Sequence, residues 1–188
     1  MRYRTIVADP PWRYTKNPPA RTGSGASAEH QYQTMTTDEM SLIDVASLAH
    51  DDAHIYVWVT NPILTEQRMA ITGSLNAPAL VRAWGFEPKT MLTWHKTGPP
   101  GMGFYWRGQT EHVIFGVRGN APIPPGTRLR NLFESPRGRH SAKPEMFLDL
   151  VEQVSPGPFI ELFARRQRFA WDTWGNEALQ HVEMGGAA

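Results

Sequence analysis

Near its start the chain combines a carboxylate, two rigid prolines and an indole in four consecutive residues. A short apolar run over residues 5–8, typical of a buried strand, is followed by Asp9, Pro10, Pro11 and Trp12. Because the prolines restrict the backbone, we expect the Asp9 carboxylate and the Pro10 carbonyl to project outward in a fixed geometry. Trp12 offers a flat surface on which a planar ring can stack. Two such acceptors can hold the two N–H groups of an exocyclic amine.

The amine of a nucleobase is a poor nucleophile because its lone pair is delocalised into the ring. Two acceptors on its N–H groups favour a tetrahedral nitrogen, whose lone pair can attack a methyl sulfonium in line. Catalysis of this kind depends mostly on positioning and charge complementarity. The motif therefore predicts methyl transfer to an amine. The structural alternative is a strand that ends in a rigid turn, with Asp9 as the N-cap of a helix.

Strands and helices alternate along the rest of the chain and would position this motif. The apolar patterns predict strands over residues 5–8, 54–59, 90–94, 111–117, 158–163 and, as a last short one, 168–174. Helices are expected over residues 37–48, 63–84 (broken at Gly73 and stopped by Gly85) and 143–154. Long loops cover residues 13–34, 97–109 and 118–139. This order predicts an α/β fold with a mostly parallel sheet, helices on both faces and ligands beyond the strand ends. Trp58, Trp84 and Trp94 are expected in the core.

Composition narrows the class of protein. The 188 residues fit one domain, and without cysteine the chain has no disulfide, thiolate metal site or cysteine nucleophile. The histidine spacing indicates no metal site. With neither an apolar run long enough to span a bilayer nor a signal peptide, the expected location is the cytoplasm. The net charge is only +1, but residues 29–66 hold seven acids and no Lys or Arg, whereas residues 96–143 hold eight bases against two acids. Such polarity suits a protein with one anion-facing side.

Nearly the whole chain, from Tyr3 to about Glu177, resembles the adenine N6-methyltransferase family that contains the catalytic subunit of the eukaryotic messenger-RNA methyltransferase and compact bacterial and phage DNA enzymes. The resemblance rests on these stretches in order: ADPPWRY (8–14), QYQTMTTDEM (31–40), HIYVWVTNP (54–62), WGF (84–86), TWHK (93–96), EHVIFGVRG (111–119), SAKPE (141–145), IELFARR (160–166) and WGNE (174–177). It implies a Rossmann-like class I methyltransferase fold, permuted so that the DPPW motif precedes the cofactor-binding motif. It also implies S-adenosylmethionine as cofactor.

The resemblance assigns cofactor roles to residues at matching positions. Lys143 would bind the carboxylate of the methionine moiety, Glu161 would be the acid of the cofactor site, and Asp9 would face the cofactor as well as the base. The remaining cofactor contacts would come from Phe163, Arg165, Asn176 and Glu177. A Lys at a helix N-terminus after a loop also suits a carboxylate site. The alternative interpretations are that Lys143 is an exposed first-turn charge and that Glu161 forms a surface ion pair with Arg165 or Arg166.

The nucleic-acid substrate is expected to contact Trp12, Tyr14, Tyr32, Lys96 and Arg107. DNA adenine is the first choice, with RNA adenosine as the main alternative, N4-cytosine below it, and a non-catalytic binding subunit as the rival from another class. The aromatic residues 104–106 form either a stacking platform for bases or a subunit interface, so a homodimer or a partner subunit is expected. We expect residues 1–180 to form one methyltransferase domain and residues 181–188 a flexible tail.

Overall fold

The computed structural model describes residues 1–14, 34–65, 76–101, 105–127, 129–138 and 142–175. Within these residues the strands are β1 (Tyr3–Ala8), β2 (Ala49–Val59), β3 (Glu87–Thr97), β4 (Thr110–Arg118), β5 (Leu132–Pro136), β6 (Phe159–Leu162) and β7 (Trp171–Trp174). The helices are α1 (Thr37–Ser41), α2 (Val45–Leu48), α3 (Asn61–Thr65), α5 (Ala77–Ala83) and α6 (Glu145–Val154). None of the described helices is long and apolar enough to cross a membrane.

The strands form one seven-stranded sheet in the order β5-β3-β4-β2-β1-β6-β7. Strand β1 lies between β2 and β6 and is parallel to both, while β6 and β7, and β3 and β5, are also parallel pairs. Strand β4 is antiparallel to both β2 and β3. The sheet is therefore mostly parallel, as predicted. Because β4 is reversed, its first residues lie at the same edge as the carboxyl ends of its neighbours.

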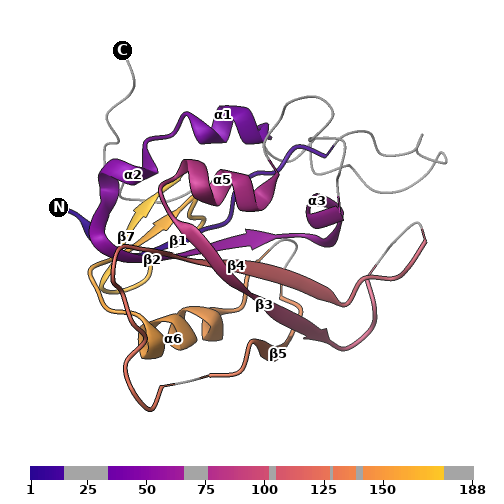
Figure 1. The fold of residues 1–188 in the computed structure, drawn as a ribbon. Coiled ribbons are helices and arrows are strands. Elements are labelled where there is room, and N and C mark those ends of the chain that lie inside the picture. Colours follow the sequence, from indigo (N-terminus) through magenta and orange to yellow (C-terminus); the bar gives the residue numbers. More distant parts are fainter. Residues whose placement is uncertain (15–33, 66–75, 102–104, 128, 139–141, 176–188) are drawn as a thin grey trace.

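Helices cover both faces of the sheet: α1, α2 and α5 lie on one side and α6 on the other (Figure 1). Side chains alternate between these faces along β1. Ile6 packs in the cluster that includes Met40 of α1 and Leu80 of α5. Val7 packs in the second cluster, with Phe147 of α6. The two apolar layers confirm the predicted α/β architecture. They also bury the three predicted core tryptophans, whose exposed fractions are 2% for Trp58, 0% for Trp84 and 1% for Trp94.

The helix predicted over residues 37–48 is two short helices. Helix α1 begins with a capping box in which the Thr36 hydroxyl accepts from the Glu39 N–H and the Glu39 carboxylate accepts from the Thr36 N–H. It ends at Ser41, and Asp44 then accepts from the Ser47 N–H as the N-cap of α2. The prediction of one helix was wrong because the Asp44 side chain begins a new helix, and a side-chain cap competes with helix continuation.

The loop predicted over residues 118–139 contains strand β5, which the sequence pattern did not reveal. It has five residues, Leu132–Pro136, and of these only Phe133 is buried. It pairs with β3 at the edge of the sheet, where a strand needs no second partner and tolerates proline. Earlier in the chain, the prediction that Gly85 ends a helix was right: α5 ends at Ala83, and Gly85 follows its C-cap Trp84 with a φ of 85°.

A buried polar network in the core gives a pH-dependent stability. The His54 ring lies 2.7 Å from both the Ser155 hydroxyl and the Ala121 carbonyl oxygen, and Tyr56 lies 2.8 Å from the same hydroxyl. Since a carbonyl only accepts, Nε2 must donate to Ala121, and Nδ1 accepts from Ser155 in the neutral ring. Burial lowers the pKa of His54 below 6.5.

We expect His54→Gln to flatten the pH dependence of stability. A buried neutral imidazole binds fewer protons folded than unfolded, so its contribution is present above pH 6.5 and lost as the pH falls below that value. The limiting slope is about 1.4 kcal/mol per pH unit. Urea unfolding of both proteins between pH 5 and 7.5 measures it. Because burial also lowers the pKa of His112, the variant keeps some pH dependence, and the test compares the slopes of stability against pH of the two proteins. Equal slopes would contradict the prediction.

Candidate active site

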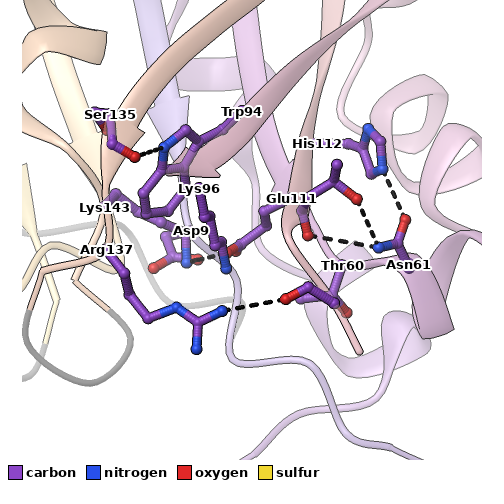
Figure 2. A network of polar contacts seen from close by, with 12 residues as sticks. Asp9, Thr60, Asn61, Trp94, Lys96, Glu111, His112, Ser135, Arg137 and Lys143 are labelled. Atoms are coloured by element: carbon purple, nitrogen blue, oxygen red, sulfur yellow. Dashed lines mark hydrogen bonds and ion pairs between the residues drawn. The ribbon is translucent and has the colours of Figure 1, made fainter. Parts of the chain in front are cut away.

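Charged side chains from four separate segments meet at the carboxyl edge of the sheet, on the face covered by α6. Asp9 directly follows β1, and Lys143 lies two residues before α6. Glu111 is the second residue of β4, which the reversed direction of that strand brings to this edge. Lys96 is near the end of β3. Figure 2 shows these four side chains next to one another.

The four groups alternate in sign. The Lys143 Nζ lies 2.9 Å from the Asp9 Oδ1 and 2.9 Å from the Glu111 Oε1. The other Glu111 oxygen, Oε2, lies 2.7 Å from the Lys96 Nζ. The side chains of Lys143 and Asp9 are each 14% exposed, and that of Glu111 is 9% exposed. Because a buried charge without its partner is strongly destabilising, the loss of any one member perturbs the others.

This arrangement keeps the two central groups ionised. Burial alone would lower the pKa of Lys143, but the Asp9 and Glu111 carboxylates outweigh burial and hold that pKa above its ordinary value. Burial likewise opposes ionisation of Glu111, and the Lys143 and Lys96 ammonium groups nevertheless lower its pKa. The site therefore presents a fixed cation beside the carboxylate of the DPPW motif.

The motif itself is anchored at both ends. The Asp9 N–H donates to the Leu162 carbonyl at 3.3 Å, which ties the end of β1 to β6. The Pro10 carbonyl accepts from the Trp12 N–H at 2.9 Å. A carbonyl oxygen has two lone pairs, so Pro10 keeps one for a further donor such as a substrate amine.

Trp12 is buried, although stacking on a base would require an open face of its ring. It is only 5% exposed, packs in the core cluster and donates its Nε1–H to the Trp58 carbonyl at 2.9 Å. Its backbone also forms a bridge with Met35. In this structure the ring positions the motif and presents no open face, so stacking on a base stays a prediction.

Besides Trp12, the expected substrate residues that the structure describes are Tyr14, Lys96 and Arg107. The Tyr14 hydroxyl lies 3.0 Å from the Thr60 Oγ1, at the site's edge, and burial raises the pKa of Tyr14. Lys96 is bound to Glu111 and lies over the Trp94 ring, 4.8 Å from its centroid. Arg107 is exposed between β3 and β4, beside Tyr105 and Trp106, which are 96% and 90% exposed. Phe104 and Tyr32 lie outside the described residues.

The expected cofactor residues in and after β6 border the same edge. Glu161 is paired in register with Val7 of β1, and its Oε2 is buried without a hydrogen-bond partner among the described residues. Burial raises the pKa of Glu161 to about 7, with the Arg166 charge opposing and the Asp9 charge adding to the effect. Arg166 does not form the surface ion pair considered for Glu161. Its Nη1 lies instead 3.1 Å from the carboxylate of the exposed Glu145.

The backbone beyond Glu161 is unusual. Phe163 has a φ of 61°, in the left-handed region, and its ring packs edge-on against Trp174 with centroids 5.3 Å apart. A Cβ on Gly175 would come within 2.5 Å of the Ala164 N, so the chain passes here at close quarters. Strained, closely packed backbone of this kind concentrates at functional sites. Arg165 is half-buried nearby, whereas Asn176 and Glu177 lie outside the described residues.

The residues present fit S-adenosylmethionine. The unpartnered Glu161 oxygen is a buried acceptor that a ligand hydroxyl would satisfy. Lys143 has three N–H donors, and its carboxylate contacts in the described structure use two of them, which leaves one for the carboxylate of a ligand. Among the described residues there is no His, Asp or Glu group that could hold a metal ion.

Sequence reasoning gave no role to Glu111 or to the polar residues beside it. Asn61 donates to the Thr110 hydroxyl at 3.0 Å, and its side-chain oxygen lies 2.7 Å from the His112 Nε2 (Figure 2). These contacts tie the end of β2 to the start of β4. The available signal was a charged residue at the head of an otherwise apolar strand, but only the antiparallel pairing of β4 shows that Glu111 reaches the site.

A comparison with protein families finds that the model described as MT-A70 matches residues 3–177. Among curated proteins, the chain is 35% identical to the type II methyltransferase M.MunI of Mycoplasma sp, an alignment that covers 94% of this chain and 78% of that protein. It is 29% identical to the N6-methyladenosine RNA methyltransferase MTA1 of Cryphonectria parasitica, covering 93% and 51%. It is 27% identical to the human N(6)-adenosine-methyltransferase catalytic subunit METTL3, covering 94% and 28%. The chain thus spans about half or less of the two RNA methyltransferases.

Proposed function

Because the chain belongs to the MT-A70 family of methyltransferases, we propose that it transfers the methyl group of S-adenosylmethionine to the N6 amine of adenine in DNA. The observation that carries this proposal is the contact between Asp9 and Lys143. The contact supports the proposal because Asp9 would accept from the substrate amine and the adjacent Lys143 would bind the cofactor carboxylate. We further propose that residues 1–180 act as one methyltransferase domain, which the family match supports.

In the proposed mechanism the chain's own residues position the reactants. Bound here, S-adenosylmethionine supplies an electrophilic methyl group. Asp9 accepts one N–H of the adenine amine, and the free lone pair of the Pro10 carbonyl accepts the other. Held in this way, the nitrogen would keep its lone pair free for the methyl group that the cofactor would supply. The methylated nitrogen then loses one proton, and Asp9 is placed to receive it.

The choice of DNA rests on the relatives. The type II methyltransferase is matched at higher identity and over most of its length, whereas the chain spans much less of the RNA methyltransferases. RNA adenosine stays the second candidate because those relatives align with almost the whole of this chain. The non-catalytic alternative is weaker, since Asp9, Pro10, Pro11 and Trp12 are all present.

The target base must leave its stack to reach Asp9, so single-stranded or mismatched substrate should be engaged more readily. Arg107 and the exposed aromatic pair of Tyr105 and Trp106 would contact the strand, or a second protomer or partner subunit. With a net charge of +1, a lone protomer is expected to bind weakly and with strong salt dependence. We place this activity in the cytoplasm, where cofactor and nucleic acid are both present.

One experiment tests the substrate. The protein is incubated with isotope-labelled S-adenosylmethionine and matched DNA and RNA oligonucleotides, which are then digested to nucleosides and analysed by mass spectrometry. We expect labelled N6-methyl-2′-deoxyadenosine from DNA. Product from RNA alone would replace DNA by RNA, and methylcytosine as sole product would overturn the base assignment. Nucleic-acid binding with no methylated product would favour the non-catalytic subunit.

A further inference from the structure

Glu111 is a buried carboxylate that serves two ammonium groups at once. The residue is 6% exposed, and each of its oxygens contacts a different lysine: Oε1 is 2.9 Å from Lys143 and Oε2 is 2.7 Å from Lys96. A carboxylate is costly to bury, and here it lies at the start of a strand whose next buried residues are apolar. Its position calls for a role beyond the packing of the sheet.

The position of the Lys143 ammonium is not set by its own segment. Lys143 precedes Pro144, the N-cap of α6, which has no side-chain hydrogen bond of its own. The long side chain of a lysine is flexible, so its charged end is placed by what it contacts. In the described structure those contacts are Asp9, Glu111 and the face of Trp58, whose ring centroid is 5.3 Å from the Nζ. Asp9 is also the group that must face the substrate amine.

We propose that Glu111 is a positioning residue for Lys143. Its carboxylate gives the ammonium a second contact besides Asp9, so that Lys143 stays in place to bind the cofactor carboxylate while Asp9 turns to the amine. Lys96 neutralises the second oxygen and thereby fixes the orientation of the Glu111 carboxylate. This inference rests on the proposed function, because it gives Glu111 a task only if Lys143 binds the cofactor.

The strand pairing explains how Glu111 is held rigidly enough for this task. Its backbone is paired with Trp94 of β3, and the Lys96 ammonium lies over the Trp94 ring. The Lys96 N–H donates to the Gln109 carbonyl at 2.7 Å, which closes the base of the β3–β4 connection. Glu111 therefore projects from the firmly paired end of a hairpin, whereas Lys143 projects from the end of a loop.

The test is a double-mutant cycle on the affinity for S-adenosylmethionine, measured by calorimetry on the full chain. Because hydrogen bonds to charged groups are involved, we expect Glu111→Gln to weaken binding about tenfold and Lys143→Met about a hundredfold. Since Glu111 acts through Lys143, the double variant should bind no more than about twofold weaker than Lys143→Met alone. Glu134→Gln is the matched control and should leave the affinity unchanged. Glu134 lies on β5, the strand next to β3, and its 59% exposed side chain is paired with His95 of β3.

Additive losses in the double variant, or unchanged affinity in Glu111→Gln, would overturn the inference. Thermal unfolding shows whether Glu111→Gln folds. If it does not, the affinity is measured on the double variant Glu111→Gln with Lys96→Met, which removes one charge of each sign. A folded paired variant should show the same loss of about tenfold, and unchanged affinity in it would also overturn the inference. If the wild-type protein itself neither bound the cofactor nor transferred methyl groups, the proposed function would fail instead.

Discussion

Asp9→Ala is expected to abolish methyl transfer while leaving the affinity for S-adenosylmethionine within roughly tenfold of the wild type. In the proposed mechanism the Asp9 side chain accepts from the substrate amine, and its loss removes an interaction that matters most in the transition state. Removing one such preorganised group lowers kcat by roughly a hundredfold to a thousandfold. Loss of the proton acceptor lowers kcat by roughly a hundredfold or more again, so that transfer falls below detection. Lys143 keeps Glu111 as a partner at 2.9 Å, so the cofactor site persists. Single-turnover transfer and calorimetry measure the two quantities.

Asp51→Ala is the matched control. Asp51 pairs with Arg2 at 3.1 Å, its side chain is 78% exposed, and it lies near the opposite end of the sheet. An exposed ion pair of this kind contributes little, so both kcat and affinity should be unchanged. Asp9→Asn, which keeps the shape and removes the charge, should resemble Asp9→Ala. Full activity in either Asp9 variant would remove Asp9 from the reaction.

The fold was largely predictable because apolar runs in a parallel sheet are continuous and conspicuous. The strands around residues 5–8 and 54–59 are buried on both faces, and the sequence shows them clearly. The strand around residues 158–163 is fully buried only at Ile160 and Leu162, but it too forms a mostly apolar run. Short elements with little burial were not predicted. Strand β5 buries a single residue, and the break between α1 and α2 depends on one side-chain cap at Asp44. Such features depend on local hydrogen bonds that periodicity does not record.

The site was predictable only in part, because chain order does not show which strands are neighbours. Asp9 directly follows β1 and Glu161 lies near the end of β6, so the alternation of elements could place both at the carboxyl edge of a parallel sheet. The presence of Glu111 at the site could not be predicted, since it depends on the reversed direction of β4. The burial of Trp12 was also hidden, because an indole suits a core as well as a base-stacking platform, and only the structure shows its bond to the Trp58 carbonyl.

Glu161→Gln is expected to stabilise the protein at pH 8 and to weaken cofactor binding. Burial raises the pKa of Glu161 from 4.5 to about 7, so the folded state holds a proton that the unfolded state releases. The stability contributed by this group is therefore present below pH 4.5 and is lost as the pH rises through about 7. At pH 8 the buried ionised carboxylate costs roughly 3 kcal/mol, a maximum that glutamine would recover. Urea unfolding of both proteins at pH 6 and pH 8 should show the difference growing with pH.

A role in ligand binding would account for a buried carboxylate that lowers stability at pH 8. Ionised, it accepts from ligand hydroxyls more strongly than an amide does, so Glu161→Gln should lower the affinity for S-adenosylmethionine by about tenfold. Wild-type affinity should rise as the pH passes through about 7, and the variant's affinity should not. Glu145→Gln, on an exposed acid paired with Arg166, is the control and should change stability and affinity little. A variant that is no more stable at pH 8, or that binds the cofactor as tightly as the wild type, would show that the Glu161 carboxylate is not held ready for a ligand.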